Sequence, residues 1–202
     1  MILAAALVFS VLIALMRGGS LRRLGDVPLR WGWVALLAFG LQIYLIYFPE
    51  ARAEGLLSPR AGILILSYAL IFSVVWRNRR LPGVWLIGAG LVANFTVMVL
   101  NGGYMPITAE ALEQVGHSRN IMGSGIGARV MGTKDLVLPR ELTIAWWLSD
   151  IFVLPPPFPI PSVFSIGDLL IAAGMFHLVQ SAALGSPGRA PQIPSKERSD
   201  VR

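Results

Sequence analysis

Five long apolar segments separated by short polar linkers are the dominant feature of this 202-residue chain. They lie at about 1–16, 31–48, 61–76, 83–100 and 163–184. Hydrophobic residues make up 55% of the chain and charged residues 14%, well away from the balance of a soluble domain. At 1.5 Å per residue, each segment would form a helix of about 24–33 Å, close to the ~30 Å thickness of bilayer hydrocarbon. We therefore predict an all-α integral membrane protein with a bundle of about five transmembrane helices.

The basic residues indicate how such a bundle would be oriented. Residues 17–30, residues 77–80 and the tail after 184 hold 11 of the 17 Lys and Arg residues. With five crossings these three segments fall on one side, which the positive-inside rule places in the cytoplasm. We therefore predict a bacterial plasma-membrane protein with its N-terminus outside and its C-terminus in the cytoplasm. Residues 1–184 would form a single transmembrane domain, and the Gly- and Pro-rich tail 185–202 would be disordered.

Composition also excludes several classes of function. The chain has no cysteine, so disulfides and thiolate chemistry are excluded, and its two histidines lie far apart in the sequence. We therefore predict neither a metal site nor a cofactor. Although the net charge is +6, the basic residues flank apolar segments and form no nucleic-acid motif. The expected partner is the lipid bilayer, and no nucleic acid is expected.

The outer segment, residues 101–162, is long for a loop in so small a protein, and long loops are usually functional. Its apolar part at 141–153 is too short to span a membrane. We predict that residues 101–162 form an extracytoplasmic cap and that 141–153 is an interfacial or re-entrant segment.

Asp150 and Asp168 flank a proline-rich stretch at the outer end of the last apolar segment. Acidic residues beside hydrocarbon are costly and rare, which makes them candidates for function. Two carboxyls that share a water can hydrolyse a bond by acid–base catalysis, because their repulsion keeps one of them protonated. Ser165 and Asp168 also fit a capping box, in which Asp168 would only stabilise the start of a helix. Both interpretations remain open at this point.

Asn94 and Asn101 are seven residues apart, so both share a helix face with Met98. One interpretation is a polar track in which Asn94, Asn101 and the nearby Tyr104 position a substrate. In the alternative, Asn94 makes an interhelical hydrogen bond and Asn101 ends its helix.

Small residues also gather on two of the apolar segments, at 83–93 and at 172–174. Such residues allow two helices to approach closely.

Four stretches, in this order, resemble a bacterial family of membrane proteins known only as a domain of unknown function. They are Arg17-Gly-Gly-Ser-Leu, Trp85-Leu-Ile-Gly with Asn94, Asn101-Gly-Gly-Tyr-Met-Pro-Ile and Val163-Phe-Ser-Ile-Gly-Asp-Leu-Leu-Ile-Ala. The resemblance covers residues 1–183 and implies no activity.

A second, shorter resemblance carries chemistry. Val163-Phe-Ser-Ile-Gly-Asp168, followed by an apolar helix, is similar to the last motif of signal peptidase II, the lipoprotein signal peptidase. Leu148-Ser-Asp150-Ile-Phe occupies the place of that family's other catalytic aspartate. The resemblance implies an outward-facing pair of catalytic aspartates, although the family's asparagine in the last motif is Ser165 here.

The leading hypothesis is a membrane-embedded hydrolase of the aspartic peptidase type. It would act at the outer leaflet on a lipid-linked or membrane-inserted substrate, with Asp150 and Asp168 as the catalytic residues. Two alternatives belong to other classes. One is a non-catalytic subunit or assembly factor of a larger membrane complex, and the other is a small transporter.

Overall fold

The computed structural model describes residues 2–48, 55–117, 120–123 and 125–185, and it is mostly helical. Each predicted apolar segment corresponds to one long helix, and α4 extends beyond its predicted segment at both ends. The helices are α1 (Ile2–Met16), α2 (Leu21–Gly25), α3 (Gly32–Tyr47), α4 (Pro59–Arg77), α5 (Val84–Leu100), α6 (Ala109–Gln114) and α7 (Ile166–Leu184). The tail predicted to be disordered lies outside the described residues, except for Gly185.

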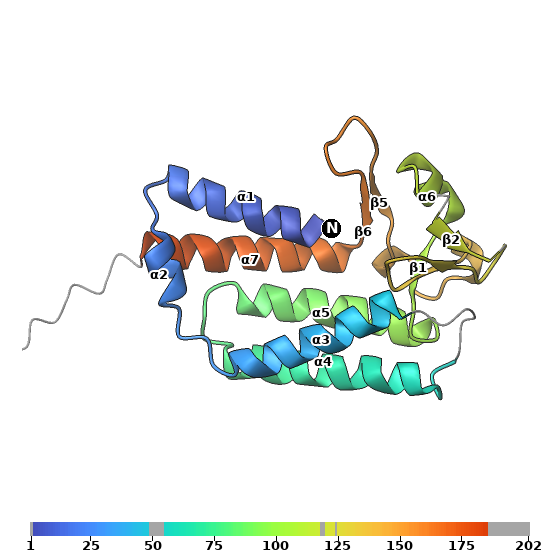
Figure 1. The fold of residues 1–202 in the computed structure, drawn as a ribbon, viewed down its shortest axis with the longest axis horizontal. Helices are drawn as coiled ribbons and strands as arrows, with labels where there is room; N and C mark the ends of the chain where they lie inside the picture. The colour runs from blue at the N-terminus through green and yellow to red at the C-terminus, as the bar shows by residue number, and fades with distance from the viewer. Residues whose placement is uncertain (1, 49–54, 118–119, 124, 186–202) are drawn as a thin grey trace, which may run out of the picture.

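The five long helices run side by side (Figure 1), and their contacts give the order α1, α7, α5, α4, α3. The connections alternate between the two ends of this array. The short α2, the turn between α4 and α5, and the C-terminal end of α7 share one end, and the described parts of residues 101–165 lie at the other. The array therefore places the basic linkers 17–30 and 77–80 together, as the sequence predicts. By length and composition, α4 and α7 could each cross a membrane, whereas α1, α3 and α5 are apolar but shorter.

Local signals define where the helices begin and end. Ser58 caps α4 by accepting a hydrogen bond from the backbone N–H of Ala61, and Pro59 occupies the first helical position. Helix α5 ends before Gly102 and Gly103, whose φ angles of 73° and 90° suit glycine and turn the chain out of the helix. The residues next to these two helix ends therefore determine where α4 begins and where α5 ends.

Helices α5 and α7 pack backbone against backbone through two pairs of glycines. A Cβ atom on Gly174 would lie 2.6 Å from the carbonyl oxygen of Gly83, and one on Gly90 would collide with the carbonyl oxygen of Gly167. The glycines are seven residues apart on each helix, so both pairs lie on one contact line of the antiparallel helices. The predicted close approach of small residues is confirmed, and glycine is required at both crossing points.

The expectation of an all-α fold is wrong for the outer segment, which contains two small sheets. A four-stranded mixed sheet has the order β1-β4-β3-β2, and a separate hairpin pairs β5 with β6. The strands are β1 (Met105–Ile107), β2 (Ile121–Met122), β3 (Arg129–Val130), β4 (Asp135–Val137), β5 (Phe152–Leu154) and β6 (Ser162–Phe164). With two or three residues each, these strands are too short to show the alternation that predicts a strand.

The stretch 141–153 also lacks a long helix. It contains most of the 3₁₀ turn η2 (Arg140–Leu142), the whole of η3 (Trp146–Leu148) and the start of β5. Its placement at or in a membrane stays a prediction.

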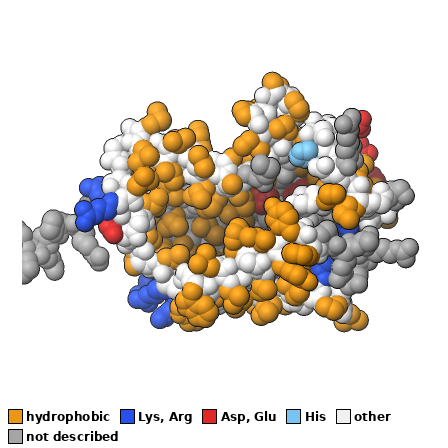
Figure 2. Space-filling view, viewed as in Figure 1, with side chains coloured by type: hydrophobic (Ala, Val, Ile, Leu, Met, Phe, Trp, Pro, Cys, Tyr) orange, Lys and Arg blue, Asp and Glu red, His pale blue; other side chains and the backbone are white. Residues whose placement is uncertain are grey.

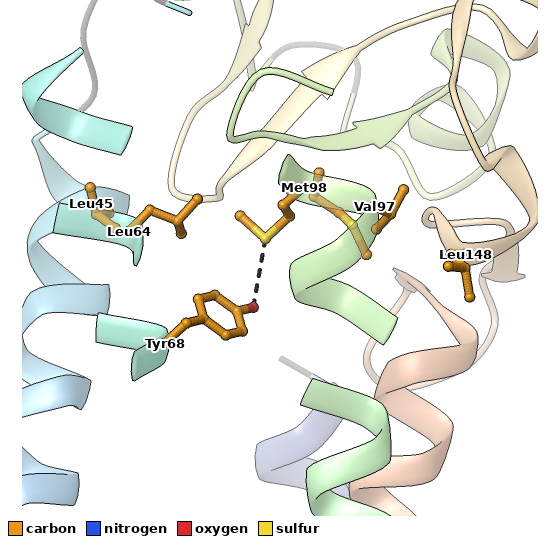
Figure 3. Packing of buried hydrophobic residues seen from close by; sticks show 7 residues of the cluster. Leu45, Leu64, Tyr68, Val97, Met98 and Leu148 are labelled. Atoms are coloured by element: carbon orange, nitrogen blue, oxygen red, sulfur yellow. Dashed lines mark hydrogen bonds between the residues drawn. The ribbon is translucent and has the colours of Figure 1, made fainter. Parts of the chain in front are cut away.

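Two clusters of buried side chains stabilise the outer segment. One packs it against the helices, and the other lies within the segment. In the first, Leu45, Leu64 and Val97 from three helices pack with Leu148 of η3 (Figure 3). In the same cluster the Tyr68 hydroxyl donates a hydrogen bond of 3.6 Å to the Met98 sulfur. The second cluster lies within the outer segment and comprises Ile107, Ala111, Leu112, Ala128, Val130 and Val137. The outer segment thus has a core of its own, joined to the helices by apolar packing.

The glycine contact generates a prediction about stability. Gly90→Ala should lower the midpoint of thermal unfolding in detergent, because its methyl group would force α5 and α7 apart at a cost of about 1–3 kcal/mol. The matched control is Gly62→Ala in α4, where a Cβ atom meets nothing within 4 Å. That change should be neutral or stabilising, since alanine is the better helix former. Equal midpoints for the two variants would contradict the close contact.

Candidate functional site

The β5–β6 hairpin folds the proline-rich stretch back on itself and returns Asp168 toward Asp150. Phe152 lies opposite Phe164 in this hairpin, and the two rings stack with their centroids 5.5 Å apart. Asp150 precedes the first strand by two residues, and Asp168 is the third residue of α7, just after the second strand. Two carboxyls that are 18 residues apart in the sequence thereby reach the same end of the helical array.

Asp150 and Asp168 line one cavity of about 320 Å³ between the outer ends of the long helices and the mixed sheet. We call it the acidic cavity. Its lining residues are Ile2, Leu3, Ile46, Tyr68, Asn94, Met98, Met105, Gly132, Thr133, Lys134, Asp135, Asp150, Val163 and Asp168. Figure 2 shows acidic side chains deep in a hollow between the helices and the outer segment. The structure thus brings together three of the predicted site residues: Asp150, Asp168 and Asn94.

Asp168 is held by hydrogen bonds from two directions. Its Oδ1 accepts a hydrogen bond of 2.9 Å from Asn94 Nδ2, and its Oδ2 accepts one of 3.2 Å from the backbone N–H of Ser165. Ser165 Oγ in turn donates to Asn94 Oδ1 at 2.7 Å and accepts from the backbone N–H of Asp168. The predicted capping box is therefore confirmed, and Asn94 extends it across to α5. Each carboxylate oxygen accepts two hydrogen bonds readily, so this network leaves Asp168 able to accept more.

Asp150 lies in a different environment. Its backbone N–H donates to the carbonyl of Pro106 at 3.2 Å, which fixes the residue beside β1. The side chain is only 8% exposed, and Oδ1 has no hydrogen-bond partner among the described residues. Burial raises the pKa of this carboxyl well above its usual range, and the nearby Asp135 and Asp168 carboxylates raise it further. The environment of Asp150 therefore favours the protonated form of its carboxyl.

Lys134 and Asp135 also line the acidic cavity, although the sequence analysis did not select them. Parallel pairing of β1 with β4 sets Asp135 opposite Met105 and thereby places it at the end of the helices. Lys134 Nζ donates a hydrogen bond of 2.7 Å to Gln42 Oε1, and Gln42 Nε2 donates to Ser67 Oγ at 2.7 Å. A chain of hydrogen bonds thus joins the loop before β4 to α3 and α4.

Burial also shifts the pKa values of this adjacent pair. It raises the pKa of Asp135 to about 6, with a hydrogen bond from Thr133 and the Lys134 charge acting in the opposite direction. Burial lowers the pKa of Lys134, while the three nearby carboxylates act to raise it. Among the described residues, no group of three His, Cys, Asp or Glu side chains is arranged to hold a metal ion.

Asn101 and Tyr104, the other two predicted substrate-binding residues, lie outside the lining of the acidic cavity. Asn101 Oδ1 accepts from the backbone N–H of Ile144, and its Nδ2 donates to the carbonyls of Ile144 and Val97. These bonds tie the end of α5 to the outer segment.

Tyr104 is 1% exposed and lies between two buried arginines. The guanidinium carbons of Arg60 and Arg129 are 4.3 Å and 4.6 Å from the centre of its ring. Cation–π contacts of this kind hold the ring in place. The described contacts of Asn101 and Tyr104 are therefore structural.

The fold and the site define a mostly helical protein with five apolar helices and an acidic cavity at one end of them. The chain belongs to a family of unknown function, DUF5317, which matches residues 26–180. A protein of Thermotoga maritima described as uncharacterized is 26% identical over 138 residues, which is 67% of this chain and 74% of that protein. No solved structure matches the chain. Membership in a family of unknown function is as predicted, whereas the resemblance to signal peptidase II stays a prediction.

The raised pKa of Asp135 predicts how stability depends on pH. The folded state holds this proton up to about pH 6, whereas an unfolded aspartate releases it near pH 4. The folded state therefore binds more protons between these values, and stability should increase as the pH falls from 7 toward 4. Asp135→Asn should reduce this increase in thermal unfolding experiments in detergent. Glu113→Gln, an exposed site outside the cavity, is the control. An unchanged pH dependence of stability in Asp135→Asn would contradict a raised pKa of Asp135 in the folded state.

Proposed function

We propose that this protein is a membrane-embedded hydrolase that acts at the outer leaflet on a lipid-linked or membrane-inserted substrate. The single observation that carries the proposal is that Asp150 and Asp168 line one cavity in contrasting environments. A buried carboxyl, whose Oδ1 has no partner among the residues that the structure describes, lies near a carboxylate that accepts two hydrogen bonds. Two carboxyls in different environments within one cavity can serve as the acid and the base of a single reaction.

In this proposal α1, α3, α4, α5 and α7 all cross the membrane, with the acidic cavity at the outer surface. The alternation of the helices and the shared end of the basic linkers support this orientation. The shortest of these five helices, α1, has 15 residues and a length of about 23 Å, so the bilayer would thin or the helix would be extended by flanking residues.

The proposed reaction uses only water and the two aspartates. The Asp168 carboxylate accepts a proton from water, whose oxygen forms a bond to the substrate's carbonyl carbon. The protonated Asp150 donates its proton to the carbonyl oxygen as the double bond opens. When the intermediate collapses, the bond to the leaving group breaks and Asp168 returns its proton to that group. One hydroxyl of the intermediate then reprotonates Asp150, so the products are a carboxylic acid and an alcohol or amine.

Asn94 is a positioning residue in this scheme. Its Nδ2–H group orients the Asp168 carboxylate, and Ser165 in turn fixes the amide of Asn94. Any side chain at Gly167 would displace Asn94 Oδ1, so glycine at this position keeps the network intact.

The orientation can be tested directly because the chain has no native cysteine. Arg80→Cys lies in the turn between α4 and α5, and Glu113→Cys lies on α6 in the outer segment; both sites are exposed. In intact cells a membrane-impermeant maleimide should label Glu113→Cys and not Arg80→Cys. After permeabilisation it should label both. Labelling of Arg80→Cys alone in intact cells would reverse the proposed orientation.

Turnover should depend on both aspartates. Asp150→Asn and Asp168→Asn should each lower hydrolysis by about 100-fold or more, because each removes one proton-transfer group. The assay uses purified protein in liposomes with fluorogenic lipid esters and quenched membrane-spanning peptides, and Glu113→Gln is the control. Thermal unfolding of each variant shows whether the fold is retained.

Full turnover in a folded Asp168→Asn variant would rule out the catalytic role. Stable co-purification with another membrane protein, together with harmless substitution of both aspartates, would favour a non-catalytic subunit of a complex.

A further inference from the structure

The acidic cavity contrasts in charge with the rest of the chain. The whole protein carries a net charge of +6, whereas the cavity lining contains three aspartates and a single lysine. Asp135 is the first residue of β4, and Lys134 precedes it at the end of the loop before that strand. The cavity therefore offers carboxyl groups to a cation and one ammonium group to an anion.

In the described part of the chain, one oxygen of these carboxyls is buried without a hydrogen-bond partner. Asp150 Oδ1 is buried, and among the described residues nothing donates a hydrogen bond to it. Leaving such an oxygen without a donor costs about 1–3 kcal/mol, so a ligand that supplies an N–H group would recover that energy. Lys134 can donate further hydrogen bonds to an anionic group of the same ligand, because an ammonium group has three N–H donors and Gln42 accepts from one of them.

The lining of the cavity also includes apolar side chains from the ends of two helices. Ile2 and Leu3 come from the first turn of α1, and Ile46 comes from the last turn of α3. Figure 2 shows hydrophobic side chains lining the hollow on its helical side, next to the acidic side chains. A molecule that fits this surface has hydrocarbon chains and a compact head group with both charges.

We propose that the acidic cavity binds the zwitterionic head group of an amine-bearing membrane phospholipid, such as an ethanolamine phospholipid. Its ammonium group would lie against Asp135 and donate to Asp150 Oδ1, and its phosphate would lie against Lys134. The acyl chains would leave the cavity beside Ile2, Leu3 and Ile46. This inference rests on the proposed function for the outward placement of the site, and it names the class of substrate.

Lipid selectivity of the intact protein tests the inference. The protein is released from nanodiscs that contain equal amounts of phosphatidylethanolamine and phosphatidylglycerol with matched chains, and retained lipids are counted by native mass spectrometry. We expect phosphatidylethanolamine to be retained about tenfold more, the ratio that one charge-assisted hydrogen bond supplies. Equal retention of the two lipids by the unaltered protein would overturn the proposal, and this comparison needs no variant.

Variants then locate the selectivity. The double variant Asp135→Asn/Asp150→Asn should lose the preference, and the exposed-site control Glu113→Gln should keep it. Ile46→Trp should reduce retention, because Ile46 lines the cavity and the larger side chain would occupy part of its volume. Its control is Leu36→Trp on the exposed surface of α3, where Leu36 is 73% exposed and outside the cavity lining, and retention should be unchanged. A preference that survives both cavity changes would place lipid binding elsewhere and overturn the inference.

This binding measurement is independent of turnover. Selective retention without hydrolysis of any substrate would uphold the binding site and reject the hydrolase. Hydrolysis without selective retention would uphold the hydrolase and reject this class of substrate.

Discussion

The contact between α5 and α7 is the constraint on which the rest of the structure depends. Two glycine pairs let the backbones touch, and no residue with a Cβ atom fits at Gly90 without moving one of the helices. Because α1 packs on α7 and α4 packs on α5, this central contact sets the position of both halves of the array. In a lipid environment, where apolar burial contributes little between helices, close packing of this kind is a main source of helix association.

The same contact builds the candidate site. With α5 and α7 this close, Asn94 reaches Ser165 and Asp168 across the interface and completes a network that includes the capping box of α7. The structural and functional interpretations of Asp168 are therefore compatible. A carboxylate that is fixed by its helix start and by a neighbouring helix is also a carboxylate whose position in the cavity is well defined.

A feature can be predicted from the sequence when the residues that determine it lie close together in the chain. The long helices and the capping box arise from residues close together in the chain, and both were predicted. Lys134 and Asp135 reach the cavity only through parallel pairing of β1 with β4, a contact between segments about 30 residues apart. No local pattern marks that pairing, so these two cavity residues could not be selected.

Asn101 and Tyr104 were recognised as polar residues near the end of a helix, but their described contacts are structural and do not involve the cavity. Asn101 does end its helix, as one interpretation held, and its amide is used to bind the backbone at Ile144. Tyr104 follows the glycines that turn the chain inward, so its ring is buried between Arg60 and Arg129. Polarity next to a membrane helix identifies residues that need partners, and only the tertiary fold decides whether the partner is the protein or a ligand.

The cost of burying ionisable side chains is the strongest argument that the cavity exists for a function. Removing a charged side chain from water costs several kcal/mol, and apolar residues of similar size would often stabilise the same position better. Here Asp150 is buried with one oxygen lacking a donor among the described residues, beside a lysine and two further carboxyls. Folding alone gives no reason to keep this arrangement, because the apolar clusters already join the outer segment to the helices. A site that uses the shifted pKa values and the unfilled hydrogen-bonding capacity supplies that reason.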